Sequence, residues 1–127
     1  MKNNKNNKNI NYIVSPVIRY NNTDVDKYII LKENKNKSGV YRLVNNINGK
    51  SYVASSRSLS KKLNIYYSLS SLKRKNGSII IYRALLKYGH SNFSLDILEY
   101  SEPSELIARE QYYIDYFKPE YNILKKS

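Results

Sequence analysis

Two tyrosines on a predicted β-hairpin are the first residues in this sequence whose type and spacing could serve chemistry. Tyr41 lies in "GVYRLVN" and Tyr52 in "SYVASS", on the two sides of an Asn48-Gly49 turn. A two-residue turn would pair Asn45 with Tyr52, and this register places both phenol rings on the same face of the hairpin. Tyrosine is also a favoured strand residue, so packing alone could account for both positions.

A glutamate near the C-terminal end is the second candidate for chemistry. The stretch "SEPSELIAREQYYIDYF" predicts a helix that opens on Ser and Pro and ends before Pro119. On a helical wheel, Glu110 projects from the middle of an apolar stripe. The stripe consists of Leu106, Ile107, Tyr113, Ile114 and Phe117. A carboxylate there needs a partner, because burying an unpaired charge is costly. Two interpretations stay open: a buried ion pair, or a carboxylate that binds a metal ion.

The distribution of charge predicts a polyanion as the partner. The formal net charge is +12, and the segment from Asn34 to Leu95 contains twelve Lys or Arg residues and no Asp or Glu. Seven of the ten acidic residues follow between Asp96 and Glu120. An AT-rich gene would raise the lysine content, but it would not remove acidic residues over such a length. An acid-free basic segment is typical of a surface that binds nucleic-acid phosphates.

The rarest residue types exclude several kinds of site. The sequence has no Cys and a single His, His90, which excludes disulfides, thiolate zinc sites, cysteine nucleophiles and two-histidine metal sites. No apolar run approaches the roughly 18 residues of a membrane span, so we expect no membrane partner. Any catalysis must use the oxygen and nitrogen groups of other residues, with or without a hard metal ion.

Basic residues in and after the first predicted helix could contact phosphate. Lys62 lies at the edge of the apolar stripe of that helix, one turn before Tyr66. Arg57 and Lys61 are expected to face solvent, where they could bind a nucleic-acid backbone without reading its sequence. The basic stretch "KRKNGS" would follow the backbone in the same way. Its charged residues are Lys73, Arg74 and Lys75.

The elements that must position these residues form one α+β domain. Strands are predicted at residues 40–45, 51–55 and 93–100, and helices at 58–69, 78–88 and 101–117. We expect a small, three-stranded, mostly antiparallel sheet with flanking helices, an α/β sandwich. Residues 1–37, which open on the Asn/Lys-rich stretch "MKNNKNNKN", are predicted to be a basic arm and linker. The folded domain is expected at residues 38–127.

In these residues and their order, the chain resembles the GIY-YIG nuclease superfamily, and most of all the intron-encoded homing endonucleases of fungal mitochondria. The two motifs are Gly39-Val40-Tyr41 and Tyr52-Val53-Ala54, separated by the hairpin. The stretches "YRALLKYGHSNFSLDILEY" and "REQYYIDYFKPEYNILK" are also similar to those proteins. The resemblance covers about residues 37–125 and includes the order of the elements.

The resemblance implies roles for individual residues. Tyr41 and Tyr52 correspond to motif tyrosines that line the active site. Glu110 corresponds to the metal-binding glutamate, which implies one Mg²⁺ or Mn²⁺ ion, and Asn122 corresponds to an asparagine that supports the site. The position of the catalytic helix arginine is occupied by Lys62, which keeps the charge but loses the bidentate fork. Ala54 replaces the glycine of the second motif.

These implications predict a homing-type endonuclease that hydrolyses DNA phosphodiesters. A tyrosine of ordinary pKa, about 10, is a poor base at neutral pH, so Tyr41 or Tyr52 would need a nearby cation to lower it. An alternative is a catalytically inactive protein of the same fold that binds DNA or RNA, as part of an organellar ribonucleoprotein or ribosome or as an intron-splicing helper. The C-terminal recognition module common in homing enzymes does not follow within these residues. Base composition and resemblance predict a mitochondrial, organelle-encoded protein.

Overall fold

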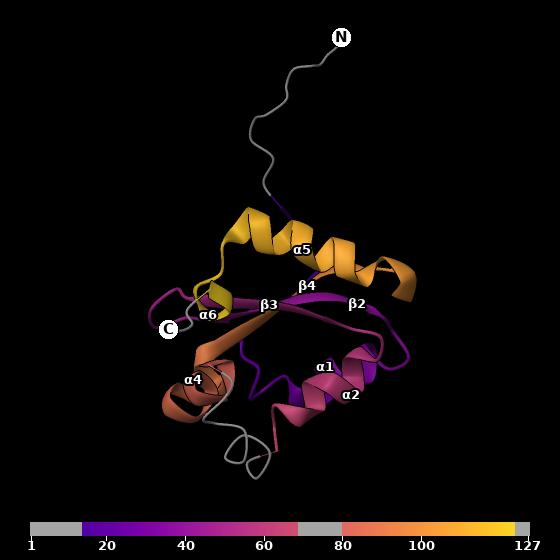
Figure 1. The fold of residues 1–127 in the computed structure, drawn as a ribbon. Helices are drawn as coiled ribbons and strands as arrows, with labels where there is room; N and C mark the ends of the chain where they lie inside the picture. The colour runs from indigo at the N-terminus through magenta and orange to yellow at the C-terminus, as the bar shows by residue number, and fades with distance from the viewer. Residues whose placement is uncertain (1–13, 69–79, 124–127) are drawn as a thin grey trace.

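A four-stranded antiparallel sheet forms the middle layer of the protein, as seen in a computed structural model that describes residues 14–68 and 80–123. The strands are β1 (Ile18–Tyr20), β2 (Gly39–Asn45), β3 (Ser51–Ser56) and β4 (Phe93–Tyr100), arranged in the order β1-β4-β2-β3. Helix α5 (Leu106–Phe117) covers one face of the sheet, and α1 (Lys27–Glu33), α2 (Leu59–Ile65) and α4 (Ile80–Tyr88) lie on the other (Figure 1). The predicted α+β class is confirmed.

The sheet has four strands where the sequence predicted three. The additional strand, β1, pairs with β4 through Ile18↔Ile97 and Tyr20↔Leu95. It is only three residues long, which is too short for an alternating pattern to reveal it. Helix α1 follows it, and Tyr20 and Ile30 are both buried in the core. Part of the segment predicted to be an arm and linker therefore belongs to the layered structure.

The hairpin of β2 and β3 keeps the predicted faces but not the predicted register. Tyr41 pairs with Ala54 and Leu43 with Tyr52, a shift of two residues. The connection is longer than a two-residue turn, since residues 46–50 lie outside the strands. The backbone N–H of Asn45 donates to the Lys50 carbonyl across this loop. Since side chains alternate with a period of two, an even shift leaves Tyr41 and Tyr52 on the same face.

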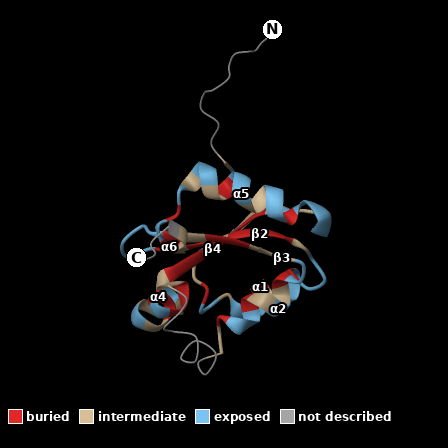
Figure 2. Cartoon of the chain, in the orientation of Figure 1, coloured by how far each residue is buried: buried red, intermediate tan, exposed pale blue. Residues whose placement is uncertain are grey.

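Two cores lie on the two faces of the sheet, and the buried residues follow the strands in Figure 2. The larger core packs Tyr41 and Leu43 of β2, together with Leu95 of β4, against α1, α2 and α4. The smaller core joins the strands to α5. Its buried members are Val40, Val53, Leu98, Leu106 and Tyr113. The two phenols and α5 thus lie on opposite sides of the same hairpin.

The predicted apolar stripe of α5 is wrong at one position. Leu106 and Tyr113 are buried, and Ile114 and Phe117 are partly buried against the smaller core. Ile107 is 88% exposed. On the helical wheel Ile107 lies within about 20° of the partly buried Ile114, so its exposure follows from its place in the first turn of α5 and not from the helical period. No helix in residues 14–68 and 80–123 is long and apolar enough to span a membrane.

Candidate active site at the edge of β3

Strand β3 is an outer strand of the sheet, and its alternating side chains reach both layers. Tyr52 and Ala54 point to the side of the larger core, where Tyr41 also lies. Val53 packs in the smaller core, under α5. Ser55 belongs to the same alternation as Val53 and contacts α5 directly, because its hydroxyl donates a 2.6 Å hydrogen bond to Glu110 Oε1. The edge of β3 is therefore where groups from both layers meet.

A cluster of tyrosines occupies the lower side of this edge. The hydroxyls of Tyr41 and Tyr66 are 2.6 Å apart and hydrogen-bonded, and their rings meet edge to face at 6.2 Å between centroids. Tyr82 of α4 packs edge to face on Tyr66 at 5.6 Å. Tyr41 and Tyr66 are almost completely buried, whereas Tyr52 is partly exposed. Of the three phenols on or beside the hairpin, Tyr52 is the one that can reach a bound molecule.

The electrostatics of the cluster keep its phenols protonated. Burial raises the pKa of Tyr41 and of Tyr66 well above 10, although the hydrogen bond to Tyr66 acts against this at Tyr41. The pKa of Tyr52 is raised by burial and then by the negative charge of Glu110. That charge also raises the pKa of Tyr41. Within the protein alone, the expected lowering of a tyrosine pKa does not occur, because burial raises the pKa of all three phenols and the charge of Glu110 adds to this at Tyr52 and Tyr41.

Glu110 approaches the edge of β3 from α5 and is partly buried. The ion pairs recorded within residues 14–68 and 80–123 join Arg19 and Arg42 to Asp96 and Arg109 to Glu99, so none of these three arginines is paired with Glu110. In the same ranges, the hydrogen bond from Ser55 reaches Oε1 and none reaches Oε2. Glu110 is thus only partly buried and is held by a neutral hydroxyl, so its carboxylate is not enclosed in the core.

Asn122 supports the strand rather than reaching into the site. It lies on the short helix α6 (Glu120–Ile123). Its amide nitrogen donates to the carbonyl of Val53 at 2.8 Å, and its amide oxygen accepts from the Val53 N–H at 2.8 Å. The Ser51 N–H donates to Glu120 Oε1 at 3.1 Å. Through these bonds α6 completes the outer side of β3 and fixes the position of Tyr52 beside Val53.

The predicted basic residues fall into separate places. Lys62 lies on α2 beside the tyrosines, with its Nζ atom 5.6 Å from the centroid of the Tyr66 ring. Arg57 and Lys61 are exposed, as expected, and each lines a surface hollow that includes none of Tyr41, Tyr52 and Tyr66. Lys73, Arg74 and Lys75 lie outside the described residues. The structure therefore places Lys62, and not the other two, beside the tyrosine cluster.

Two residues of this arrangement were not among the predicted site residues. Tyr66 links Tyr41 to α2, and its position one helical turn after Lys62 was the available signal. Ser55 holds Glu110, and nothing in the local sequence marks it. No cluster of three or more His, Asp or Glu residues able to hold a metal occurs in the described ranges. A metal ion here would have Glu110 as its protein carboxylate and complete its shell from water and a ligand.

Comparison with known proteins decides the family. Residues 37–122 match the GIY-YIG catalytic domain. The chain belongs to the GIY-YIG family. The catalytic domain of the intron endonuclease I-TevI, in a form with a Glu-to-Ala substitution, is similar at 29% identity over 72% of this chain and 97% of that one, with a TM-score of 0.57. A second structure of the catalytic domain of the homing endonuclease I-TevI matches at 30% identity over 70% and 100%, with a TM-score of 0.55.

Membership of the GIY-YIG family makes this chain a nuclease that acts on phosphodiester bonds, with nucleic acid as its substrate. The matched segment runs from the start of the hairpin to Asn122. It contains Tyr41, Tyr52, Lys62 and Glu110, but it begins after β1 and α1. The GIY-YIG domain of this chain therefore carries an additional strand and helix on its N-terminal side.

Proposed function

We propose that this GIY-YIG domain is a homing-type endonuclease that cleaves DNA with the help of one Mg²⁺ or Mn²⁺ ion. The observation that carries the proposal is that Ser55 holds Glu110 at the edge of β3, the strand that carries Tyr52, and that the carboxylate is near enough to raise the pKa of Tyr52. Lys62 supplies a positive charge on the same side of α2 as Tyr66. The choice of DNA follows the intron and homing endonucleases that the chain resembles.

The donor set suits a hard cation that arrives with its substrate. Magnesium prefers oxygen ligands, keeps several waters, and is commonly bound through one or two carboxylates together with substrate phosphates. Glu110 offers that carboxylate, and its Oε1 is already oriented by Ser55. When bound, the ion would supply Lewis-acid polarisation of the phosphate and stabilisation of the leaving oxygen.

The side chains of the chain itself divide the remaining work. Tyr52, the accessible phenol, accepts a hydrogen bond from the attacking water and so orients it toward the phosphorus atom. It does not act as the base, because its raised pKa keeps its own proton in place. The proton of the attacking water therefore passes to solvent, and the bond from phosphorus to the leaving oxygen breaks as the new bond forms. Tyr41 and Tyr66 hold one another through their hydroxyls and form the wall behind Tyr52. Lys62 offsets the negative charge that develops on the phosphoryl oxygens.

The mitochondrial location also remains a proposal. It is supported by the abundance of Asn, Lys, Ile and Tyr in the sequence, which is typical of an AT-rich gene. The resemblance to organellar homing endonucleases supports it as well. Fractionation of cells that express the native gene would test it directly.

Substitution of Glu110 tests the proposal. Supercoiled plasmid is incubated with the protein and Mg²⁺, and nicked and linear products are measured over time. We expect Glu110→Gln to lower the cleavage rate about 100-fold or more, because the loss of a charged metal ligand removes several kcal/mol of transition-state stabilisation. Asp115→Asn, on the exposed side of the same helix, removes an equal charge and is expected to cleave like the wild type.

Two results would reject the endonuclease. Equal cleavage by the wild type and Glu110→Gln would mean that the carboxylate has no catalytic part. Tight binding of plasmid with no cleavage by any variant, in Mg²⁺ or in Mn²⁺, would favour the inactive nucleic-acid-binding protein of the same fold.

A further inference from the structure

We infer that the groove between α1 and α2 is a second binding site for a nucleic-acid backbone, formed by a helix that precedes the segment matched by the family. This inference rests on the proposed nucleic-acid substrate. Its occupant is a stretch of the same polynucleotide that flanks the bond at the edge of β3. The groove is lined from α1 and the residues just after it by Tyr28, Lys32 and Lys35, and from the α2 side by Ser58, Ser60 and Lys61.

The lining of the groove carries positive charges and no negative one. The other two lining residues are Leu31 and Asn36, so the groove contains three lysines and no carboxylate. Among the described residues, the recorded ion pairs use Arg19, Arg42 and Arg109 and none of these lysines. The acidic residue of α1 closest in sequence, Glu33, accepts a 2.7 Å hydrogen bond from Tyr20. Each lysine can therefore displace a counterion from a phosphate.

An exposed aromatic ring accompanies the lysines. Tyr28 is 73% exposed, although it lies on a helix whose other face enters the core. The Nζ atom of Lys32 lies 5.8 Å from the centroid of its ring, which holds ring and cation side by side. An aromatic ring next to basic side chains can contact a sugar or stack on an unpaired base while the lysines bind phosphate.

The walls of the groove are held together by hydrogen bonds. Ser60 Oγ donates to the Leu31 carbonyl at 2.7 Å, and the Leu59 N–H donates to the Lys37 carbonyl at 2.9 Å. Behind them Asn34 is completely buried, donates to the Ile30 carbonyl at 2.8 Å and accepts from the Tyr100 hydroxyl at 2.8 Å. Fixed walls hold the backbone positions of the lysines before binding, so only their side chains have to be ordered when a polynucleotide binds.

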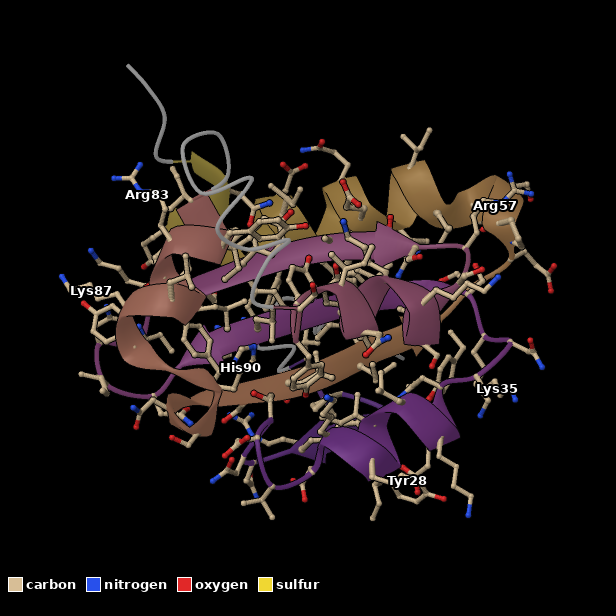
Figure 3. All side chains as sticks on the ribbon, turned by 90° about the horizontal axis from the view of Figure 1, so that it is seen from below. Tyr28, Lys35, Arg57, Arg83, Lys87 and His90 are labelled. Carbon is tan, nitrogen blue, oxygen red and sulfur yellow. The ribbon has the colours of Figure 1, made fainter. Side chains whose placement is uncertain are left out.

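The groove and the candidate active site lie on two sides of the same helix. Successive residues of α2 are turned by about 100°, so Lys62 faces Tyr66, Ser60 faces α1, and Lys61 lies exposed between them. A polynucleotide that binds at Lys62 can therefore cross Lys61 and enter the groove. An adjoining hollow contains Lys37 and Arg57 together with one carboxylate, Glu102. Figure 3 shows Tyr28, Lys35 and Arg57 on the same side of the protein.

Neutralising two of the groove lysines tests this site by its salt dependence. A fluorescent DNA duplex of about 20 base pairs and the matching single strand are titrated with the full chain in EDTA, over a series of KCl concentrations. We expect Lys32→Gln with Lys35→Gln to weaken binding about tenfold and to reduce the slope of log K against log salt by about 2 for the duplex, since each lost phosphate contact removes about 0.9. Binding in EDTA needs no cleavage, so this readout is independent of catalysis.

The matched control removes the same charge from the other end of the protein. Arg83 and Lys87 lie on α4, opposite the groove in Figure 3, and both are exposed. Arg83→Gln with Lys87→Gln is expected to leave the salt slope nearly unchanged. Equal loss of affinity and slope in the two double variants would overturn the inference, because net charge alone would then explain binding. If the groove variant shows a reduced salt slope while Glu110→Gln cleaves like the wild type, the groove stands as a binding site and the proposed endonuclease mechanism is rejected.

Discussion

The hydroxyls of Tyr41 and Tyr66 share a single hydrogen bond deep in the larger core, while Tyr52 keeps part of its surface in contact with solvent. The two motif tyrosines thus have different physical situations although they lie on the same face of one hairpin. A buried phenol stabilises its neighbours, and an accessible one can touch the substrate. The raised pKa of both excludes a tyrosinate base in the absence of an added positive charge.

This difference predicts that one Tyr→Phe substitution affects the cleavage rate and the other affects stability. Tyr52→Phe is expected to lower the cleavage rate about 100-fold, with little change in stability, because it removes a group that orients the reacting water. Tyr41→Phe is expected to lower the free energy of unfolding by about 1–3 kcal/mol, because the buried Tyr66 hydroxyl then loses its partner. For both variants, plasmid cleavage measures the rate and urea unfolding measures the free energy of unfolding. The assignment fails if Tyr41→Phe abolishes cleavage at unchanged stability.

At the scale of the elements, the first motif glycine is explained by how closely β4 approaches β2. The ladder between these strands shifts register between Val40 and Tyr41. A Cβ atom on Gly39 would lie 2.3 Å from the Glu99 carbonyl oxygen and 3.1 Å from the Tyr100 Cα. Both are backbone atoms of the paired strand β4, so neither can move aside without disturbing the pairing of β2 with β4. Ala54, in place of the second motif glycine, fits because its side chain has room in the larger core.

Gly39→Ala is therefore expected to destabilise the domain by about 2–3 kcal/mol through steric overlap in the sheet. Gly49→Ala is the comparison. Gly49 has open space around it but a positive φ of 78°, so its loss is expected to be smaller, about 1 kcal/mol. Thermal unfolding of both variants gives the ranking. A melting temperature of Gly39→Ala at or above that of Gly49→Ala would contradict the argument.

How far the sequence predicted this structure depends on the kind of contact. The shared face of Tyr41 and Tyr52 was predictable because alternation survives an even slip, whereas the register was not, since Asn45 closes a longer loop. The position of Glu110 on the sheet side of α5 was predictable from the helical period. The bond from Ser55 was not, because it joins residues that only the folded sheet brings together. Strand β1 was not predictable, because its three residues are too few to show an alternation of apolar and polar side chains.

At the scale of the whole molecule, one ionic network fastens α5 to the sheet. Glu99, near the end of β4, accepts two 2.9 Å hydrogen bonds from the guanidinium of Arg109 and one of 2.7 Å from the Tyr113 hydroxyl. The hydroxyl of Ser101 donates to it as well. These bonds, those from Arg109 first, lower the pKa of Glu99 from 4.5 to about 2. Because α5 carries Glu110, the same network sets how the upper layer presents its carboxylate.

Because the pKa of Glu99 is lowered, the stability that this network contributes depends on pH in the acid range. The unfolded state takes up a proton near pH 4.5 and the folded state only near pH 2, so the contribution of Glu99 is complete above pH 4.5 and is lost as the pH falls through that window. We expect Glu99→Gln to lower the melting temperature at neutral pH by roughly 5 °C and to flatten its fall in acid. Glu105→Gln, an exposed neighbour, should behave like the wild type. An unchanged acid profile in Glu99→Gln would refute the assignment.

The bonds that α6 makes to β3 also have a consequence for the behaviour of many copies in solution. An outer strand with unused amide and carbonyl groups is a template for pairing with a neighbouring molecule. Here the ladder groups of Val53 are occupied by the Asn122 amide, and the N–H of Ser51 by Glu120. A single turn of helix thus covers this edge of β3 and hinders edge-to-edge aggregation. If α6 detached, the exposed edge would make the domain prone to self-association in spite of its high net charge.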